Sequence, residues 1–218
     1  MSEDKELENI YEYDEEQEDN EQEENCEQEE EFSQIDNDKM FFNICITQLI
    51  ALVIAVIWGY FGKIFWWNQI FFDFSIINSL YIVTGLFVFN AIFYIFRKQL
   101  KFMHYDWLIK SIYIPIFGKF NIWQCILLSI LSGFCEEALF RGVMSVAWGL
   151  IISSIVFGLL HLGDKRLIFS GIWIAIIGFC FAYVYKITGN LGISIVAHFL
   201  NNFLCFIAVK IIVKENKI

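Results

Sequence analysis

Six apolar runs, five of them uninterrupted, limit what this chain can fold into. They cover residues 41–61, 76–96, 122–144, 147–162, 167–185 and 191–213. A helix needs roughly 20 apolar residues to cross a hydrocarbon core about 30 Å thick, and most of the runs are close to that length. Apolar residues make up 57% of the sequence, which is more than a water-soluble domain can bury. The sequence therefore predicts an all-α fold, a polytopic transmembrane helix bundle of about six spans.

Residues 102–120 are mixed in composition and are left outside the span count. Tyrosine, tryptophan, lysine and aspartate alternate there with isoleucine and phenylalanine, and the segment contains the one proline of the chain, Pro115. Such a composition is typical of a helix that lies at the membrane surface. We therefore expect an interfacial or re-entrant segment between the second and third spans.

The first 39 residues differ sharply from the rest. They hold 19 of the 25 acidic residues against two lysines, which gives a net charge of −17. A self-repelling segment with little apolar surface cannot offset the entropy lost on ordering. We therefore expect residues 1–39 to form a disordered acidic tail and residues 40–218 to form the transmembrane domain. Because the tail has no pattern of a cleavable signal peptide, the first run is expected to act as the insertion signal.

Basic residues predict the orientation, because short cytoplasmic loops accumulate lysine and arginine. Clusters follow the second, fourth and sixth runs: Arg97, Lys98, Lys101, Lys165, Arg166, Lys210, Lys214 and Lys217. Six spans with both termini in the cytoplasm place all of these on one side of the lipid bilayer, with Lys63 and Lys186 as exceptions. No basic stripe or binding motif predicts a nucleic-acid partner, and no feature indicates an oligomeric state.

Ionisable residues inside the runs are candidates for function, because a charged side chain at mid-membrane costs roughly 2.5–3.5 kcal/mol on insertion scales. The densest group lies in SGFCEEALFRG. Glu137 and Arg141 are four residues apart on one helix face, in the order that favours an ion pair. Glu136 is rotated by about 100° from Glu137 and lacks that partner. Glu136 is therefore the carboxylate that we expect to take part in chemistry.

Two further runs contain polar side chains within apolar sequence. SSIVFGLLHLG has Phe157 and His161 at spacing i, i+4, and GISIVAHFLNNF has His198 well inside the last run, with Asn202 one turn further along. Asn201 can reach the same face. A histidine that ends an apolar run can be a simple interfacial residue, and deep polar residues can be hydrogen-bonding partners between helices. Phe157 is expected to pack rather than to react.

Together these groups resemble the motifs of the CPBP family of intramembrane proteases. The resemblance lies in EExxxR at residues 136–141, FxxxH at 157–161 and HxxxN at 198–202. The family includes the type II CAAX prenyl endopeptidases and proteins linked to bacteriocin processing or self-immunity. The similarity covers about residues 122–209, and it implies a transmembrane protease domain.

The resemblance also implies roles for individual residues. Glu136 would activate the attacking water, and His161 would orient this water or shuttle its proton. His198 and Asn202 would stabilise the oxyanion of the tetrahedral intermediate, as hydrogen-bond donors can in a dry cavity. Structural support would come from Glu137, Arg141 and Phe157.

The sequence leaves open whether a metal takes part. The histidine pair with an intervening glutamate that many zinc peptidases have is absent, and the six cysteines form no CxxC pair. Glu136, His161 and His198 could still bind zinc with an open position for water. We favour a mechanism without a cofactor, in which a glutamate activates water.

Three functions compete at this point. The first is an endopeptidase that hydrolyses a peptide bond of a membrane-associated protein or peptide, such as a prenylated CaaX protein or a leader peptide. The second is a non-catalytic membrane scaffold or bacteriocin self-immunity protein of the same fold. The third, a proton-coupled transporter, ranks last because the two halves show no repeat of polar sites. The C-terminus KENKI lacks a prenylation cysteine, so we expect the chain not to be a CaaX substrate itself.

Overall fold

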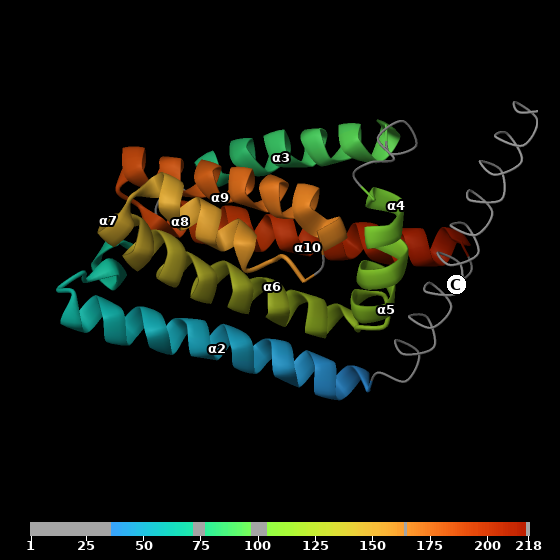
Figure 1. The fold of residues 1–218 in the computed structure, drawn as a ribbon, viewed down its shortest axis with the longest axis horizontal. Coiled ribbons are helices and arrows are strands. Elements are labelled where there is room, and N and C mark those ends of the chain that lie inside the picture. Colours follow the sequence, from blue (N-terminus) through green and yellow to red (C-terminus); the bar gives the residue numbers. More distant parts are fainter. Residues whose placement is uncertain (1–35, 72–76, 97–103, 164, 217–218) are drawn as a thin grey trace, which may run out of the picture. The chain divides into compact units, whose positions relative to one another are not determined.

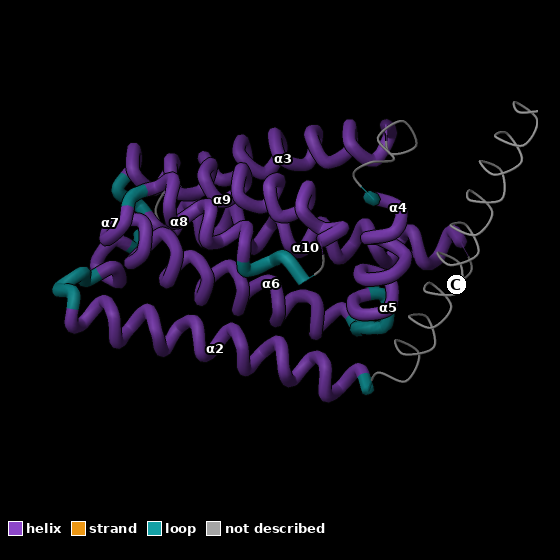
Figure 2. Tube along the Cα trace, viewed as in Figure 1, coloured by secondary structure: helices purple, strands orange, loops and turns teal. Residues whose placement is uncertain are grey.

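The structure of the chain is a computed structural model that describes residues 36–71, 77–96, 104–163 and 165–216. Within these residues it contains helices and no strands, which confirms the all-α prediction (Figures 1 and 2). The chain divides into two units, Met1–Asp36 and Asn37–Ile218, and every helix described below belongs to the second. Most of the acidic tail, residues 1–35, lies outside the described residues, and its predicted disorder with it.

The helices follow the apolar runs of the sequence. In chain order the elements are α2 (Asn37–Phe61), η1 (Trp66–Gln69), α3 (Ile77–Phe96), α4 (Tyr105–Leu108), η4 (Ile109–Tyr113), α5 (Ile114–Phe117), α6 (Ile122–Glu136), η5 (Glu137–Met144), α7 (Ser145–Trp148), α8 (Leu150–Leu159), η6 (Lys165–Leu167), α9 (Ile168–Thr188) and α10 (Leu191–Asn216). The helix α6 begins with a capping box, in which Asn121 and Gln124 each accept a hydrogen bond from the other's backbone N–H. Gly189, in the left-handed conformation, ends α9.

The prediction of six spans is wrong in number for the residues that the structure describes. Four helices there are long and apolar enough to cross a membrane: Asn37–Phe61, Ile122–Trp148, Ile168–Thr188 and Leu191–Lys214. The helix α8 has ten residues, so it is about 15 Å long and covers half of the hydrocarbon core. The physical reason is Gly149, whose positive φ of 87° reverses the chain and divides the predicted run 147–162. The apolar part of α3, Ile77–Ile92, is also shorter than a full span.

The segment before α6 is helical and too short to span. It consists of α4, η4 and α5, which follow one another without a gap from Tyr105 to Phe117. Its end is held by the last helix, because the Lys210 ammonium of α10 donates hydrogen bonds to the carbonyls of Gly118 and Phe120. Excluding residues 102–120 from the span count therefore agrees with the structure.

The last helix, α10, packs against several of the other long helices. It contacts α6, α3 and α9, while α6 also contacts α2, and α8 packs along α9 (Figure 1). A buried cluster that includes Trp66, Phe140 and Leu191 fills the space around η5. The helix α2 exposes Ile50 and Val53 by more than half of their surface. Large exposed apolar side chains of this kind suit lipid rather than water, and the chain is an integral membrane protein.

The helices α6 and α10 cross most closely at Gly133. A Cβ atom at this position would lie 2.9 Å from the backbone nitrogen of Phe199 and 3.0 Å from the carbonyl oxygen of Ile195. Both of these neighbours are backbone atoms, so no side chain can move aside to make room. Such small-residue crossings let membrane helices approach closely. Gly133 therefore sets the distance between the two helices that supply the EExxxR and HxxxN residues.

We expect Gly133→Ala to destabilise the fold by about 1–3 kcal/mol, because the added methyl group pushes two backbones apart. Gly85→Ala is the matched control. Nothing lies within 4 Å of a Cβ atom on Gly85, so alanine there is expected to stabilise α3 by about 0.5–1 kcal/mol. Thermal unfolding in detergent compares the two variants. Equal midpoints for both would contradict the close crossing at Gly133.

Candidate active site

Glu136 stands at the end of α6 and contacts side chains of two other helices. Its Oε1 accepts a hydrogen bond of 2.7 Å from Gln48 Nε2 of α2. Its Oε2 lies 3.7 Å from Nε2 of His198 on α10. The side chain of Glu136 is 12% exposed, so it is nearly buried yet reachable. Glu136 has no ion-pair partner one turn away on its own helix, as expected, and its contacts come from Gln48 of α2 and His198 of α10.

Glu137 uses one oxygen for two cationic or donor groups. Its Oε1 lies 2.9 Å from Nη1 of Arg141 and 2.7 Å from Nδ1 of His198. A carboxylate only accepts hydrogen bonds, so His198 Nδ1 carries the proton of this contact and donates it. The side chain of Glu137 is completely buried. The pair with Arg141 therefore also fixes the orientation of the His198 ring.

The Arg141 guanidinium lies between aromatic rings. Its central carbon is 4.2 Å from the ring centroid of Phe157 and 5.5 Å from that of Phe181, and such cation–π contacts contribute about 0.5–2 kcal/mol each. The ring of Phe181 in turn stacks on His198, with centroids 5.3 Å apart. The FxxxH phenylalanine is therefore a packing residue that borders the charged pair.

His161 reaches the same region through Phe157. The ring centroid of Phe157 lies 4.8 Å from that of His161 and 6.1 Å from that of His198, so the phenyl ring contacts both imidazoles. Nδ1 of His161 donates to the carbonyl of Phe157 at 2.8 Å. His161 is exposed, whereas His198 is buried.

Asn202 lies one helical turn beyond His198 and bonds to a serine. Its Nδ2 donates to Ser132 Oγ at 2.9 Å, and Asn201 Nδ2 lies 3.4 Å from Asn202 Oδ1. Ser132 and Glu136 occupy the same face of α6, four residues apart. The polar contacts between α6 and α10 therefore form two layers, with Glu136 and His198 in one and Ser132 and Asn202 in the other.

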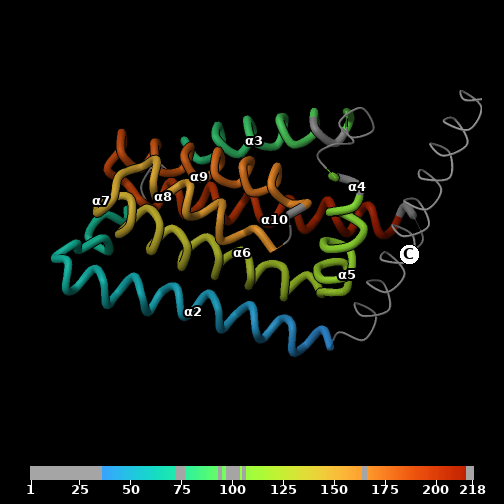
Figure 3. The backbone as a smooth tube through the Cα atoms, in the orientation of Figure 1, coloured from blue at the N-terminus to red at the C-terminus, as the bar shows by residue number. Residues whose placement is uncertain are grey.

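A tight reversal at Gly149 brings the motifs to one level. Arg141 lies eight residues before this glycine and Phe157 lies eight residues after it, and the two are in contact. Figure 3 shows the backbone turning between α7 and α8. The hydroxyl of Ser153 on α8 donates to the carbonyl of Phe140 at 2.6 Å and ties the two arms together. Broken helices of this kind are tolerated where they border protein or a cavity.

The first arm of this reversal is a π-helix, η5, over Glu137–Met144. The hydroxyls of Ser145 and Ser153 donate to the carbonyls of Arg141 and Phe140 in this segment, and the Phe140 carbonyl also accepts from the Ser145 backbone N–H. All eight residues of η5 are buried. π-helical turns are uncommon and often occur at functional sites, and this one begins at Glu137.

Two residues of the site were missed in the sequence analysis. Gln48 lies within an apolar run and its partner Glu136 is 88 residues away. Ser132 bonds to a residue 70 positions away. The usable signal for Gln48 is its spacing from Ala55 and Gly59, the other buried residues of α2, because steps of seven and four residues keep one helix face.

The residues considered for zinc are not gathered around one point. Among the described residues, no three histidine, cysteine, aspartate or glutamate side chains are close enough to hold a metal ion. Both nitrogen contacts of His198 involve carboxylates, and Nδ1 of His161 is bonded to a backbone carbonyl. The donor set does not fit a three-ligand zinc site.

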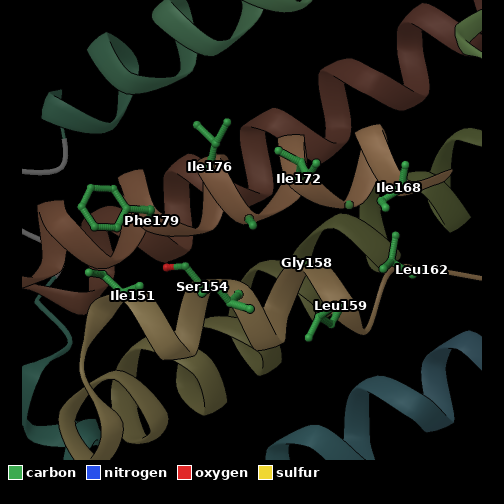
Figure 4. A pocket seen from close by; sticks show the side chains of 12 residues that line it. Ile151, Ser154, Gly158, Leu159, Leu162, Ile168, Ile172, Ile176 and Phe179 are labelled. Atoms are coloured by element: carbon green, nitrogen blue, oxygen red, sulfur yellow. The ribbon is translucent and has the colours of Figure 1, made fainter. Parts of the chain in front are cut away.

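An apolar groove runs between α8 and α9 (Figure 4). It has a volume of about 440 Å³ and begins beside Leu159 and Leu162, which flank His161 in the sequence. Its walls are formed by aliphatic side chains of both helices, such as Ile155 and Ile172, with Phe179 at the far end. The groove is suited to an apolar chain rather than to a polar ligand.

Comparisons with known proteins agree with the motifs. Residues 118–204 match the family described as type II CAAX prenyl endopeptidase Rce1-like, which confirms the resemblance for this segment. The chain is 40% identical to uncharacterized protein YpbD of Bacillus subtilis (strain 168) over 87 residues, which are 39% of this chain and 45% of that protein. The chain thus aligns with less than half of that relative. No solved structure matches it significantly.

Proposed function

We propose, from the match of residues 118–204 to the Rce1-like family, that the chain is an intramembrane endopeptidase in which Glu136 activates water. The observation that supports this proposal best is the position of Glu136 Oε2, 3.7 Å from Nε2 of His198 in a nearly buried site. A separation longer than a direct hydrogen bond suits two groups that share a water molecule or a substrate atom. The catalytic residues are proposed to be Glu136, His161, His198 and Asn202.

The proposed reaction is hydrolysis of an amide. Glu136 takes a proton from water as the oxygen attacks the carbonyl carbon of the scissile bond. The carbonyl oxygen becomes an oxyanion, and His198, in its protonated form, donates to it through Nε2–H. Glu136 then returns the proton to the amide nitrogen, the carbon–nitrogen bond breaks, and a carboxylic acid and an amine leave.

Glu137 and Arg141 support this chemistry without touching the substrate. The hydrogen bond from His198 Nδ1 to Glu137 leaves Nε2 as the nitrogen that faces Glu136. The pair of Glu137 and His198 resembles the general arrangement in which a buried carboxylate fixes the orientation of a catalytic histidine. Asn202 is proposed as a second donor to the oxyanion, and His161, which is exposed, as a proton donor or acceptor.

The proposed substrate is a membrane-associated peptide that carries a long apolar group, of which a prenylated CaaX terminus is one example. The support is the apolar groove between α8 and α9, whose lining includes Leu159 and Leu162, close to His161 in the sequence. A lipid-modified peptide can place its apolar chain in such a groove while its backbone reaches the polar residues. We also propose that both termini face the cytoplasm, as the basic clusters predict.

Cleavage by purified protein in liposomes tests the proposed function. Three probes are used: a farnesylated CaaX peptide, the same peptide without the farnesyl group, and a leader peptide. Mass spectrometry is expected to identify a single cleaved bond in at least one probe, and a metal chelator is expected to leave the rate unchanged. His198→Ala is expected to lower the rate by about 100-fold, because an oxyanion donor is lost.

The control is His104→Asn, which changes a histidine outside the matched segment and is expected to keep the wild-type rate. Loss of activity on chelation would replace the proposed mechanism by a metal-dependent one. Failure to cleave any probe, combined with full function of His198→Ala in the native cell, would favour the scaffold or self-immunity alternative.

A further inference from the structure

Gln48 is a polar residue on the inward face of a helix that otherwise faces lipid. Its neighbours Leu49 and Ile50 are about half exposed, whereas Gln48 is 9% exposed. The buried residues of α2 are Gln48, Ala55 and Gly59, which lie on the side that packs against α6 and η5. Burying an amide costs free energy unless it is hydrogen-bonded. A leucine or methionine would fill the same position without that cost, so its polarity calls for a role.

The contact with Glu136 has a defined direction. A carboxylate has no proton to give, so the amide must present its Nε2–H to Oε1, at 2.7 Å. This is a hydrogen bond to a charged acceptor, a class stronger than bonds between neutral groups. With Oε1 held from α2, Oε2 is the oxygen that lies toward His198 Nε2.

The amide oxygen of Gln48 has a different environment from the amide nitrogen. Gln48 Oε1 is buried and has no hydrogen-bond partner among the described residues. Buried amide oxygens are rarely left without a donor, and the adjacent carboxylate cannot serve as one while it is ionised. A water molecule or a substrate N–H bound next to Glu136 can donate to it.

We propose that Gln48 is a positioning residue of the site, which holds the Glu136 carboxylate so that Oε2 faces His198 and whose free amide oxygen receives a hydrogen bond from the attacking water. The inference rests on the proposed function and deepens it. It assigns α2, which lies outside the matched segment 118–204, to the active site.

The test is the rate of cleavage of the farnesylated CaaX peptide in liposomes by Gln48→Met. Methionine keeps the length and volume of the side chain but has no donor. We expect kcat to fall by about 10- to 100-fold, the loss of one hydrogen bond to a charged group, with KM unchanged within about twofold. If methionine prevents folding, Gln48→Asn retains the amide, and its shorter side chain, which does not reach Glu136, is expected to lower kcat similarly.

The matched control is Thr47→Val, at the preceding and exposed position, where the hydroxyl bonds only to the carbonyl of Asn43. It is expected to keep the wild-type kcat. Folded Gln48→Met and Gln48→Asn proteins with wild-type kcat would overturn the inference, as would a loss that resides in KM alone. Failure of the proposed function is distinguishable, because then the wild-type protein itself gives no cleavage that depends on Glu136.

Discussion

Glu136→Gln is expected to lower the rate of peptide cleavage by about 1,000-fold, in the middle of the range for removal of a general base, while the protein stays folded. Glutamine has the shape of glutamate, and its amide oxygen can still accept the hydrogen bond from Gln48 that Glu136 Oε1 accepts now. The amide cannot take a proton from water. The variant therefore separates the proton transfer from the packing of the site, and single-turnover kinetics in liposomes measures the difference.

The control for this variant is Cys135→Ala. Cys135 precedes Glu136, is buried, and has the thiol that a nucleophilic mechanism would need. We expect it to keep the wild-type rate within a few-fold, because the thiol acts as a small apolar group. An inactive Cys135→Ala protein together with an active Glu136→Gln protein would assign the reaction to Cys135 and contradict the glutamate mechanism.

Arg141→Met is expected to lower the free energy of unfolding by about 3–5 kcal/mol, the typical cost of leaving one partner of a buried ion pair behind. Glu137 is completely buried and Arg141 is 1% exposed, so after the substitution the carboxylate cannot reach water and keeps only its contact with His198. The substitution also removes the contacts of the guanidinium with Phe157 and Phe181. Reversible unfolding in mixed micelles measures the change.

The double variant Glu137→Gln with Arg141→Met removes both charges and is expected to recover a large part of this loss, since no buried charge remains. Lys186→Met is the surface control. Lys186 is exposed in the last turn of α9, and its loss is expected to change stability by less than about 0.5 kcal/mol. A double variant as unstable as Arg141→Met would indicate that packing, rather than charge, dominates at this position.

Local spacing predicted the parts of the site that lie on one helix. Glu137 and Arg141 are neighbours because four residues make about one turn, and the helices α9 and α10 start within one residue of the predicted runs. Contacts between helices were not predictable in this way. The sequence contains no signal that pairs Gln48 with Glu136 or Ser132 with Asn202, because these pairs depend on how the helices cross at Gly133.

If every predicted run were a straight span, His161 and Glu136 would lie near opposite membrane surfaces. The turn at Gly149 removes this conflict. His161 follows this glycine by 12 residues and Glu137 precedes it by 12, so a hairpin that turns at Gly149 puts both at similar depth. Hydropathy alone does not reveal such a turn, since Trp148 and Leu150 on either side are apolar. The signal in the sequence is Gly149 itself, because glycine adopts positive φ most readily, and the structure gives it a φ of 87°.

One oxygen of Glu137 contacts both Arg141 and His198. This arrangement predicts which residues related proteins can lose during evolution. If the chain cleaves peptides as proposed, a descendant without this activity would be free to lose Glu136 and Gln48, whose proposed roles are in the reaction. It would still be obliged to keep Glu137 with Arg141, because either one alone is a buried charge. Homologues that retain all four residues would indicate selection for cleavage. Homologues that retain only Glu137 and Arg141 would indicate that the fold is kept without the reaction.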